Sequence, residues 1–153
     1  LSVGAVYRYF KSKNEIINAI AEKFAGGIAT AVLAIADKRL PLAQAMDAAL
    51  DVVDSQLGAK GAFPLAVQLW SEATIDPAIA EIVRERYAQL QGAFVTIARH
   101  AQERGELPAE ADTVAVASAL FSLMPGYALQ RMLIGTPDKE TYAAGVATLL
   151  SRR

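Results

Sequence analysis

Apolar side chains recur at intervals of three and four residues along nearly the whole chain, and no other feature constrains the fold so strongly. This spacing forms one apolar stripe on an α-helix, whereas a half-buried strand would alternate at every second residue. Strand-like alternation is scarce in the sequence. We therefore predict an all-α fold, and 153 residues, of which 54% are apolar, suffice for one sizeable core.

Residues typical of helix ends divide the chain into helical segments. Ser12 and Glu15 form a capping box that should open a long helix reaching about Lys38. Asp76-Pro77 and Asp112 are further start signals, and Gly105 is a stop signal. The later helices are expected over 40–58, 62–73, 76–105, 112–133 with an interruption at Pro125-Gly126, and after Pro137 to about Ser151.

The first fifteen residues combine small side chains, aromatic rings and positive charge. Arg8, Lys11 and Lys13 give residues 1–13 a charge of +3, whereas the whole chain carries −1. Small residues at the start of a helix let it approach base edges closely, and a basic flank suits phosphates. The segment therefore predicts a helix that enters a DNA groove, with a merely solvated basic helix end as the alternative.

Residues 2–15, Ser-Val-Gly-Ala-Val-Tyr-Arg-Tyr-Phe-Lys-Ser-Lys-Asn-Glu, resemble the recognition helix and following turn of TetR-family transcriptional regulators. The resemblance implies a remnant of a helix-turn-helix domain at 1–15 and a helical ligand-binding and dimerisation domain at 16–153. We expect contacts to double-stranded operator DNA from Ser2, Val3, Gly4, Ala5, Tyr7, Arg8, Tyr9 and Lys13. Of these, Tyr7, Tyr9 and Lys13 match positions that commonly touch the DNA backbone in this family.

The resemblance also implies a function, that of a ligand-responsive regulator, with repression released by a small apolar or aromatic effector. The family's first two helices are absent from the sequence, which starts at the third. A recognition helix of about eight residues is too short to be stable alone, so this polypeptide should bind DNA poorly without them. The alternative is a helical small-molecule-binding or dimerisation module without DNA activity.

Two further sites are expected in the body of the chain. The resemblance implies an apolar ligand cavity, and the candidates to line it are Phe63, Gln68, Trp70, Phe94, Phe121, Met124 and Tyr127. Ordinary core packing is the alternative for each of them. The last two helices are rich in Ala, Gly and Ser and are apolar nearly all round, which predicts burial on more than one side. That burial is either internal or, as in the family, within a homodimer.

Several function classes are disfavoured. The chain has no cysteine and a single histidine, His100, in a charged helix end. Phosphate loops, nucleophile motifs and metal-ligand spacings are not found in it, so we expect no catalytic residue, no metal site and no cofactor. The apolar runs are interrupted well short of a membrane span, and the N-terminus does not resemble a signal peptide. We expect a soluble cytoplasmic protein that has no membrane partner and is not an enzyme.

Overall fold

The computed structural model describes residues 12–58 and 61–151, apart from several side chains between residues 13 and 25. The regular elements of this part are all helices, so the all-α prediction is confirmed. They are α2 (Lys13–Asp37), α3 (Leu42–Asp54), α4 (Phe63–Ala73), α5 (Pro77–Glu103), α6 (Thr113–Ile134) and α7 (Lys139–Leu150).

Most helix boundaries follow from the predicted capping residues. The Ser12 hydroxyl accepts a hydrogen bond from the Glu15 N–H at 3.2 Å. The carboxylates of Asp76 and Asp112 each accept one from an N–H two residues further on, at 2.9 Å. Gly105, just past the end of α5, has a φ of +73°, a left-handed conformation that glycine adopts without the penalty of a Cβ.

Two helices depart from the expected bounds. α3 ends at Asp54, ahead of Gly58, because the next amides turn back to the carbonyls of Val53 and Asp54 in short three-residue turns. α6 continues through Pro125, so the predicted interruption there is wrong. A proline removes a single backbone donor, and in the same turn the Tyr142 hydroxyl of α7 donates to the Leu123 carbonyl at 3.0 Å. α6 therefore loses one hydrogen bond at Pro125 and continues past it, with α7 bonded to the same turn.

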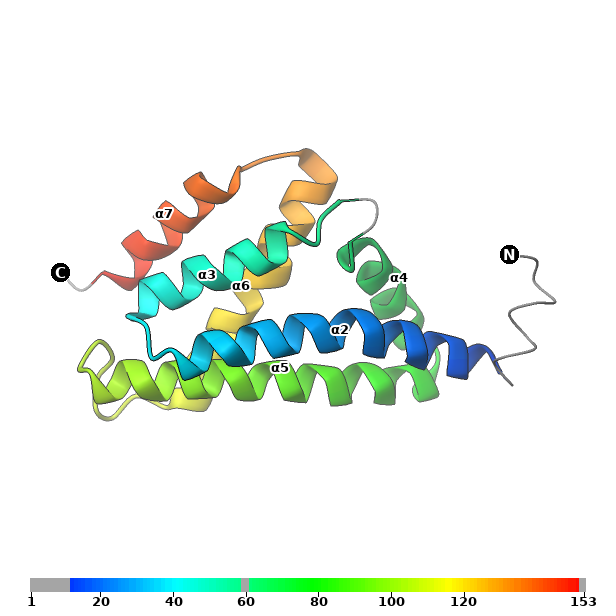
Figure 1. Cartoon of the computed structure of the whole chain (residues 1–153), viewed down its shortest axis with the longest axis horizontal. Helices are drawn as coiled ribbons and strands as arrows, with labels where there is room; N and C mark the ends of the chain where they lie inside the picture. The colour runs from blue at the N-terminus through cyan, green and yellow to red at the C-terminus, as the bar shows by residue number, and fades with distance from the viewer. Residues whose placement is uncertain (1–11, 59–60, 152–153) are drawn as a thin grey trace.

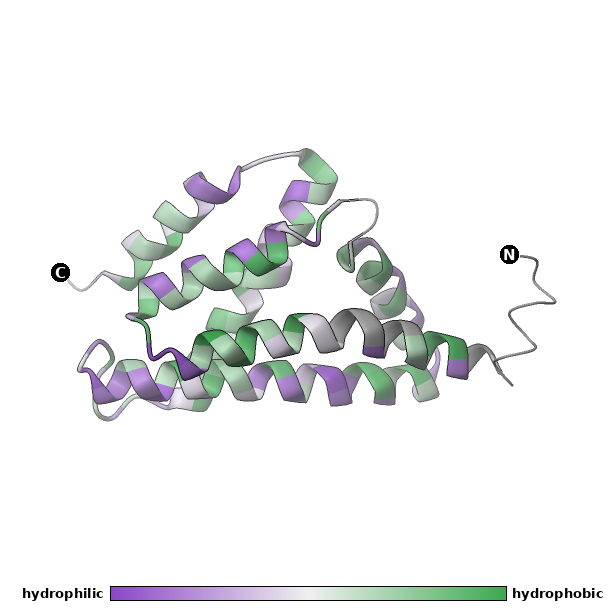
Figure 2. Cartoon of the chain, viewed as in Figure 1, coloured by the Kyte–Doolittle hydropathy of each residue, from purple (hydrophilic) through white to green (hydrophobic). Residues whose placement is uncertain are grey.

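The two longest helices, α2 and α5, lie side by side and run in the same direction (Figure 1). α6 packs along α5, α4 covers the beginning of α5, and α7 packs mainly on α3 (Figure 1). The core lies among α2, α3, α5 and α6, where Met46, Leu50, Phe94 and Tyr127 are fully buried. Figure 2 shows hydrophilic and apolar bands alternating along α5, as expected for a helix with one solvent face.

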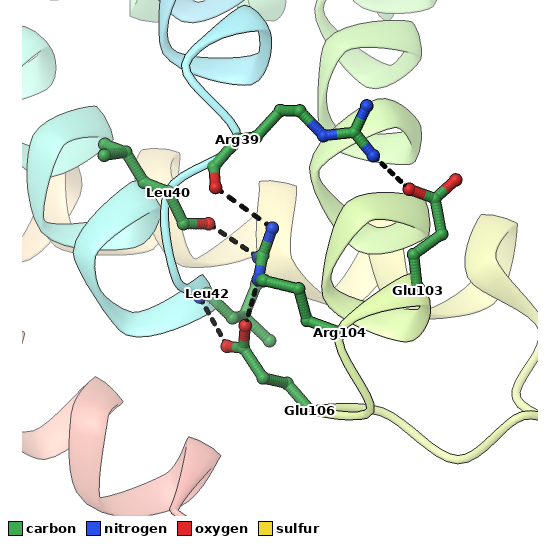
Figure 3. A network of polar contacts seen from close by, with 6 residues as sticks. All are labelled: Arg39, Leu40, Leu42, Glu103, Arg104 and Glu106. Atoms are coloured by element: carbon green, nitrogen blue, oxygen red, sulfur yellow. Dashed lines mark hydrogen bonds and ion pairs between the residues drawn. The ribbon is translucent and has the colours of Figure 1, made fainter.

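A polar network fastens the corner between α2 and α3 to the end of α5. It comprises the six residues drawn in Figure 3: Arg39, Leu40, Leu42, Glu103, Arg104 and Glu106. The Arg104 guanidinium donates to the carbonyls of Arg39 at 3.1 Å and Leu40 at 2.6 Å. The Glu106 carboxylate pairs with Arg104 and accepts from the Leu42 N–H at 2.6 Å. Burial raises the pKa of Glu106, but these two donors outweigh it, so that pKa lies below its usual value. The long helices α2 and α5 are thus clamped together at their C-terminal ends.

Candidate ligand-binding site

A cavity of about 590 Å³ lies between the helices, and α2, α3, α4, α5 and α6 all contribute to its wall. Along α5 it extends from Val83 to Phe94, ahead of the end that is clamped by Arg104. This volume falls within the range of about 300–1,000 Å³ typical of small-molecule pockets. The cavity is therefore large enough for a ligand of drug-like size.

The cavity continues the apolar stripe of α5 beyond the closed core. Phe94 and Ile97 are buried against α2, α3 and α6, whereas Val83 and Leu90, earlier in the same stripe, are only half-buried. Val83, Leu90 and Phe94 all line the cavity. The middle of the stripe, from Val83 to Leu90, therefore faces open space, whereas from Phe94 onward the stripe is packed into the core.

Aromatic rings form a continuous ladder along the cavity wall, from α4 through α5 to α6. Phe63 meets Trp70 edge to face with ring centroids 6.2 Å apart, and Trp70 meets Tyr87 in the same way at 6.2 Å. Phe121 then lies 5.1 Å from Tyr87 and 5.6 Å from Phe94. Such contacts are favourable for aromatic pairs. A flat aromatic or apolar molecule would find matching surfaces on this wall.

Few polar groups interrupt the apolar wall. Besides the Trp70 and Tyr87 rings, the described lining residues with polar side chains are Gln68, Ser71, Glu72 and Arg86. The Nε of Arg86 is buried without a hydrogen-bond partner in the described part of the chain. Burial raises the pKa of Tyr87, which keeps its hydroxyl neutral and able to donate. Because buried polar groups are normally paired, the Arg86 Nε marks a place where a bound molecule would be favoured.

Six of the seven residues predicted to line a ligand cavity do lie on its wall: Phe63, Gln68, Trp70, Phe94, Phe121 and Met124. Tyr127 does not, contrary to our expectation. It is fully buried deeper in the molecule, where its hydroxyl donates to the Asp54 carboxylate and its ring lies 5.0 Å from Tyr142. It faces α3 and α7 because it lies past the turn of α6 that meets the cavity. Ligand binding by the six residues stays a prediction.

Arg86, Tyr87 and Leu90 also line the cavity but were not among the predicted ligand residues. Arg86 carried a detectable signal in the sequence. The stripe of α5 runs through positions 79, 83, 86, 90, 94, 97 and 101, and Arg86 is the only charged residue among them. A charge at a core-facing position of an amphipathic helix is unusual and often functional.

The predicted DNA contacts Ser2, Val3, Gly4, Ala5, Tyr7, Arg8 and Tyr9 lie outside the described residues. Lys13 is the first residue of α2, and its side chain is also outside the description. DNA contact at these positions therefore stays a prediction.

The last two helices leave large apolar side chains uncovered. Leu133 and Ile134 at the end of α6 are 77% and 66% exposed, and Leu149 of α7 is 81% exposed.

Within the described residues, α6 is the one helix whose length and apolar composition would suit a membrane span, which the sequence had not led us to expect. A core helix of a soluble protein meets the same criteria, and α6 supplies Tyr127 and Met124 to the core.

The described residues form helices around an apolar cavity, and the long helix α2 beside it follows a basic N-terminal segment in the sequence, an order of elements that is typical of a transcription regulator. Residues 31–153 match the family described as BetI-type transcriptional repressor, C-terminal. Since this match spans most of the sequence, the chain belongs to the TetR family of transcriptional regulators. Proteins of this family bind DNA as regulators and are not enzymes.

The fold also resembles that of Salmonella enterica GusR. The TM-score is 0.73 at 21% sequence identity, and the match covers 98% of this chain and 77% of GusR. No curated protein matches the sequence significantly.

Proposed function

We propose that this chain is a ligand-responsive regulator whose cavity binds a small apolar or aromatic effector, and that the effector releases it, as a repressor, from operator DNA in the cytoplasm. In this proposal residues 1–15 belong to the DNA-binding domain, and residues 16–153 bind the effector and dimerise. The apolar cavity of about 590 Å³, with its ladder of aromatic rings, is the observation that carries the proposal.

α2 supplies the coupling between the cavity and the DNA-binding segment. It lines the cavity with Ile17, Ile28 and Val32, and its first residue, Lys13, is the last of the three positive charges in residues 1–13. Its other end is clamped to α5 through Arg104. A ligand that fits one position of α2 better than another shifts the population toward that position. A differential affinity of about 1–3 kcal/mol would change operator affinity by roughly 5- to 150-fold.

A homodimer formed by α6 and α7 completes the proposal. A second copy would cover Leu133, Ile134 and Leu149, which a single chain leaves exposed. A two-fold dimer would also present two recognition helices to half-sites about one helical turn apart. Movement of α2 in each subunit would then change the spacing of the two helices on DNA.

The test is fluorescence anisotropy of the complete gene product with its own upstream DNA, across a salt series and with a panel of small aromatic molecules. We expect site-selective binding that weakens with salt, and release of the DNA by at least one member of the panel. Selective DNA binding that no cavity ligand alters would refute the ligand response. Ligand binding by a folded dimer without selective DNA binding would favour a helical binding module instead.

A matched pair of variants separates the cavity from the rest of the surface. Ala66 lines the cavity from α4, whereas Ala88 is exposed on α5. Ala66→Trp should place an indole ring in the cavity, obstruct the ligand and leave the protein bound to DNA in its presence. Ala88→Trp should respond like the parent protein. Equal ligand responses in the two variants would contradict the cavity as the effector site.

A further inference from the structure

Arg86 is the one positively charged residue among the described residues that line the cavity. Its Nε is buried and has no hydrogen-bond partner, and its Nη1 reaches only Gln89 Oε1 of the same helix, at 3.4 Å. Glu72 also lines the cavity, but it does not accept from this Nε. The guanidinium therefore offers an unsatisfied donor, its Nε, at the wall of the space where a ligand would lie.

Retaining such a group against the cavity has a physical cost. A buried donor without an acceptor loses its hydration and gains no hydrogen bond in return. Elsewhere along the apolar stripe of α5 the inward positions carry Ile79, Val83, Leu90, Phe94 and Ile97, which meet no such cost. The cost is removed when a bound molecule supplies the acceptor.

We propose that Arg86 anchors a carboxylate on the effector, so that the cavity selects aromatic or apolar carboxylic acids over neutral molecules of the same shape. This inference rests on the proposed ligand-binding function of the cavity. The planar guanidinium presents paired N–H donors that match the two oxygens of a carboxylate. The rest of the molecule would lie against Trp70, Tyr87 and Phe121.

The balance of charge favours a carboxylate over a phosphate. Among the described lining residues, Arg86 supplies the one positive charge, and most of the others are apolar. A singly charged carboxylate matches Arg86, whereas a phosphate would bring a second negative charge into a mostly apolar space. Burying a charge without a partner is costly.

The test compares 2-naphthoate with 2-naphthylmethanol, its neutral counterpart, by isothermal titration calorimetry on the full chain. We expect the parent protein to bind the carboxylate at least about tenfold more tightly than the alcohol, as is typical for a hydrogen bond to a charged group. Arg86→Met should abolish this preference but still bind the alcohol, and Arg86→Lys should retain part of it because the charge remains without the fork. Arg84→Met is the matched control, since Arg84 is exposed on the same helix and pairs with Glu81.

The outcomes distinguish the anchor from the cavity. Two results would overturn the anchor and leave the cavity as a ligand site. In one, Arg86→Met keeps the full preference for the carboxylate. In the other, the parent protein binds the alcohol as tightly as the carboxylate. A parent protein that binds neither compound would overturn both. Thermal unfolding without ligand tests for a purely structural role of Arg86. If the role is structural, Arg86→Met is clearly less stable than Arg84→Met. If Arg86 anchors a ligand, Arg86→Met is as stable as Arg84→Met or more stable.

Discussion

Phe94 separates the closed core from the cavity, and replacing it with alanine tests this arrangement. The side chain is 1% exposed, packs among core residues of neighbouring helices, and lies 5.6 Å from Phe121. Removal of a buried phenyl ring costs about 3–5 kcal/mol. We expect a loss within this range, because the ring is almost fully buried among core residues and its removal leaves a cavity there.

Urea denaturation followed by circular dichroism measures this cost, and it should lower the midpoint by about 1–2 M. The space vacated by Phe94→Ala joins the cavity, so the variant should also gain affinity for three-ring over two-ring aromatic molecules. Met46→Ala is the control, because Met46 is fully buried in α3 and does not line the cavity. It should lose about 2–5 kcal/mol without any change in ligand size preference. A loss below about 1 kcal/mol for Phe94→Ala, or the same gain in both variants, would refute the reasoning.

Three more predictions concern the remaining contacts. Tyr127→Phe should cost about 1 kcal/mol in urea denaturation, since water can replace the lost donor at the half-buried Asp54; no measurable loss would contradict the pairing. Because the pKa of Glu106 is lowered in the folded protein, its carboxylate stabilises the fold above the usual pKa, and this stabilisation is lost as pH falls through the folded pKa. Glu106→Gln should therefore lower the urea midpoint most at a pH of about 7, and the deficit should shrink as the pH falls. A deficit that persists at low pH would refute this linkage. Leu149→Glu should give monomers in sedimentation velocity. Ile75→Glu is the control, because Ile75 is also 81% exposed, and it should remain a dimer. Dimers in both variants would exclude the α6 and α7 surface as the interface.

The local sequence predicted the helices well because their boundaries depend on short-range chemistry. Ser12, Asp76 and Asp112 accept hydrogen bonds from amides within three residues, and Gly105 adopts its left-handed turn. Pro125 shows the limit of such rules. Its ring removes one hydrogen bond of α6, and whether the helix breaks there depends on how α6 packs against α5 and the core, which no local pattern reveals.

The candidate site was only partly accessible from sequence. The resemblance to the TetR family implied a cavity, and aromatic residues such as Trp70 and Phe121 were candidates for its wall because such walls are mostly apolar. The periodicity of α6 could not separate Tyr127, which faces α3, from Met124, which also meets the cavity, because both positions are buried. The spacing of apolar residues along a helix indicates which face is buried. It does not indicate whether that face contacts packed side chains or a cavity.

The sequence by itself determined the helical class, most helix ends and the family, because each depends on residues close together in the chain or on a contiguous motif. Only the tertiary structure decided where the cavity lies, which side chains reach it, and that Arg86 has a buried donor without a partner. These depend on how five helices from distant parts of the chain pack together. Packing is set by the shapes of side chains that meet across helices, and those meetings are not encoded in any single stretch of sequence.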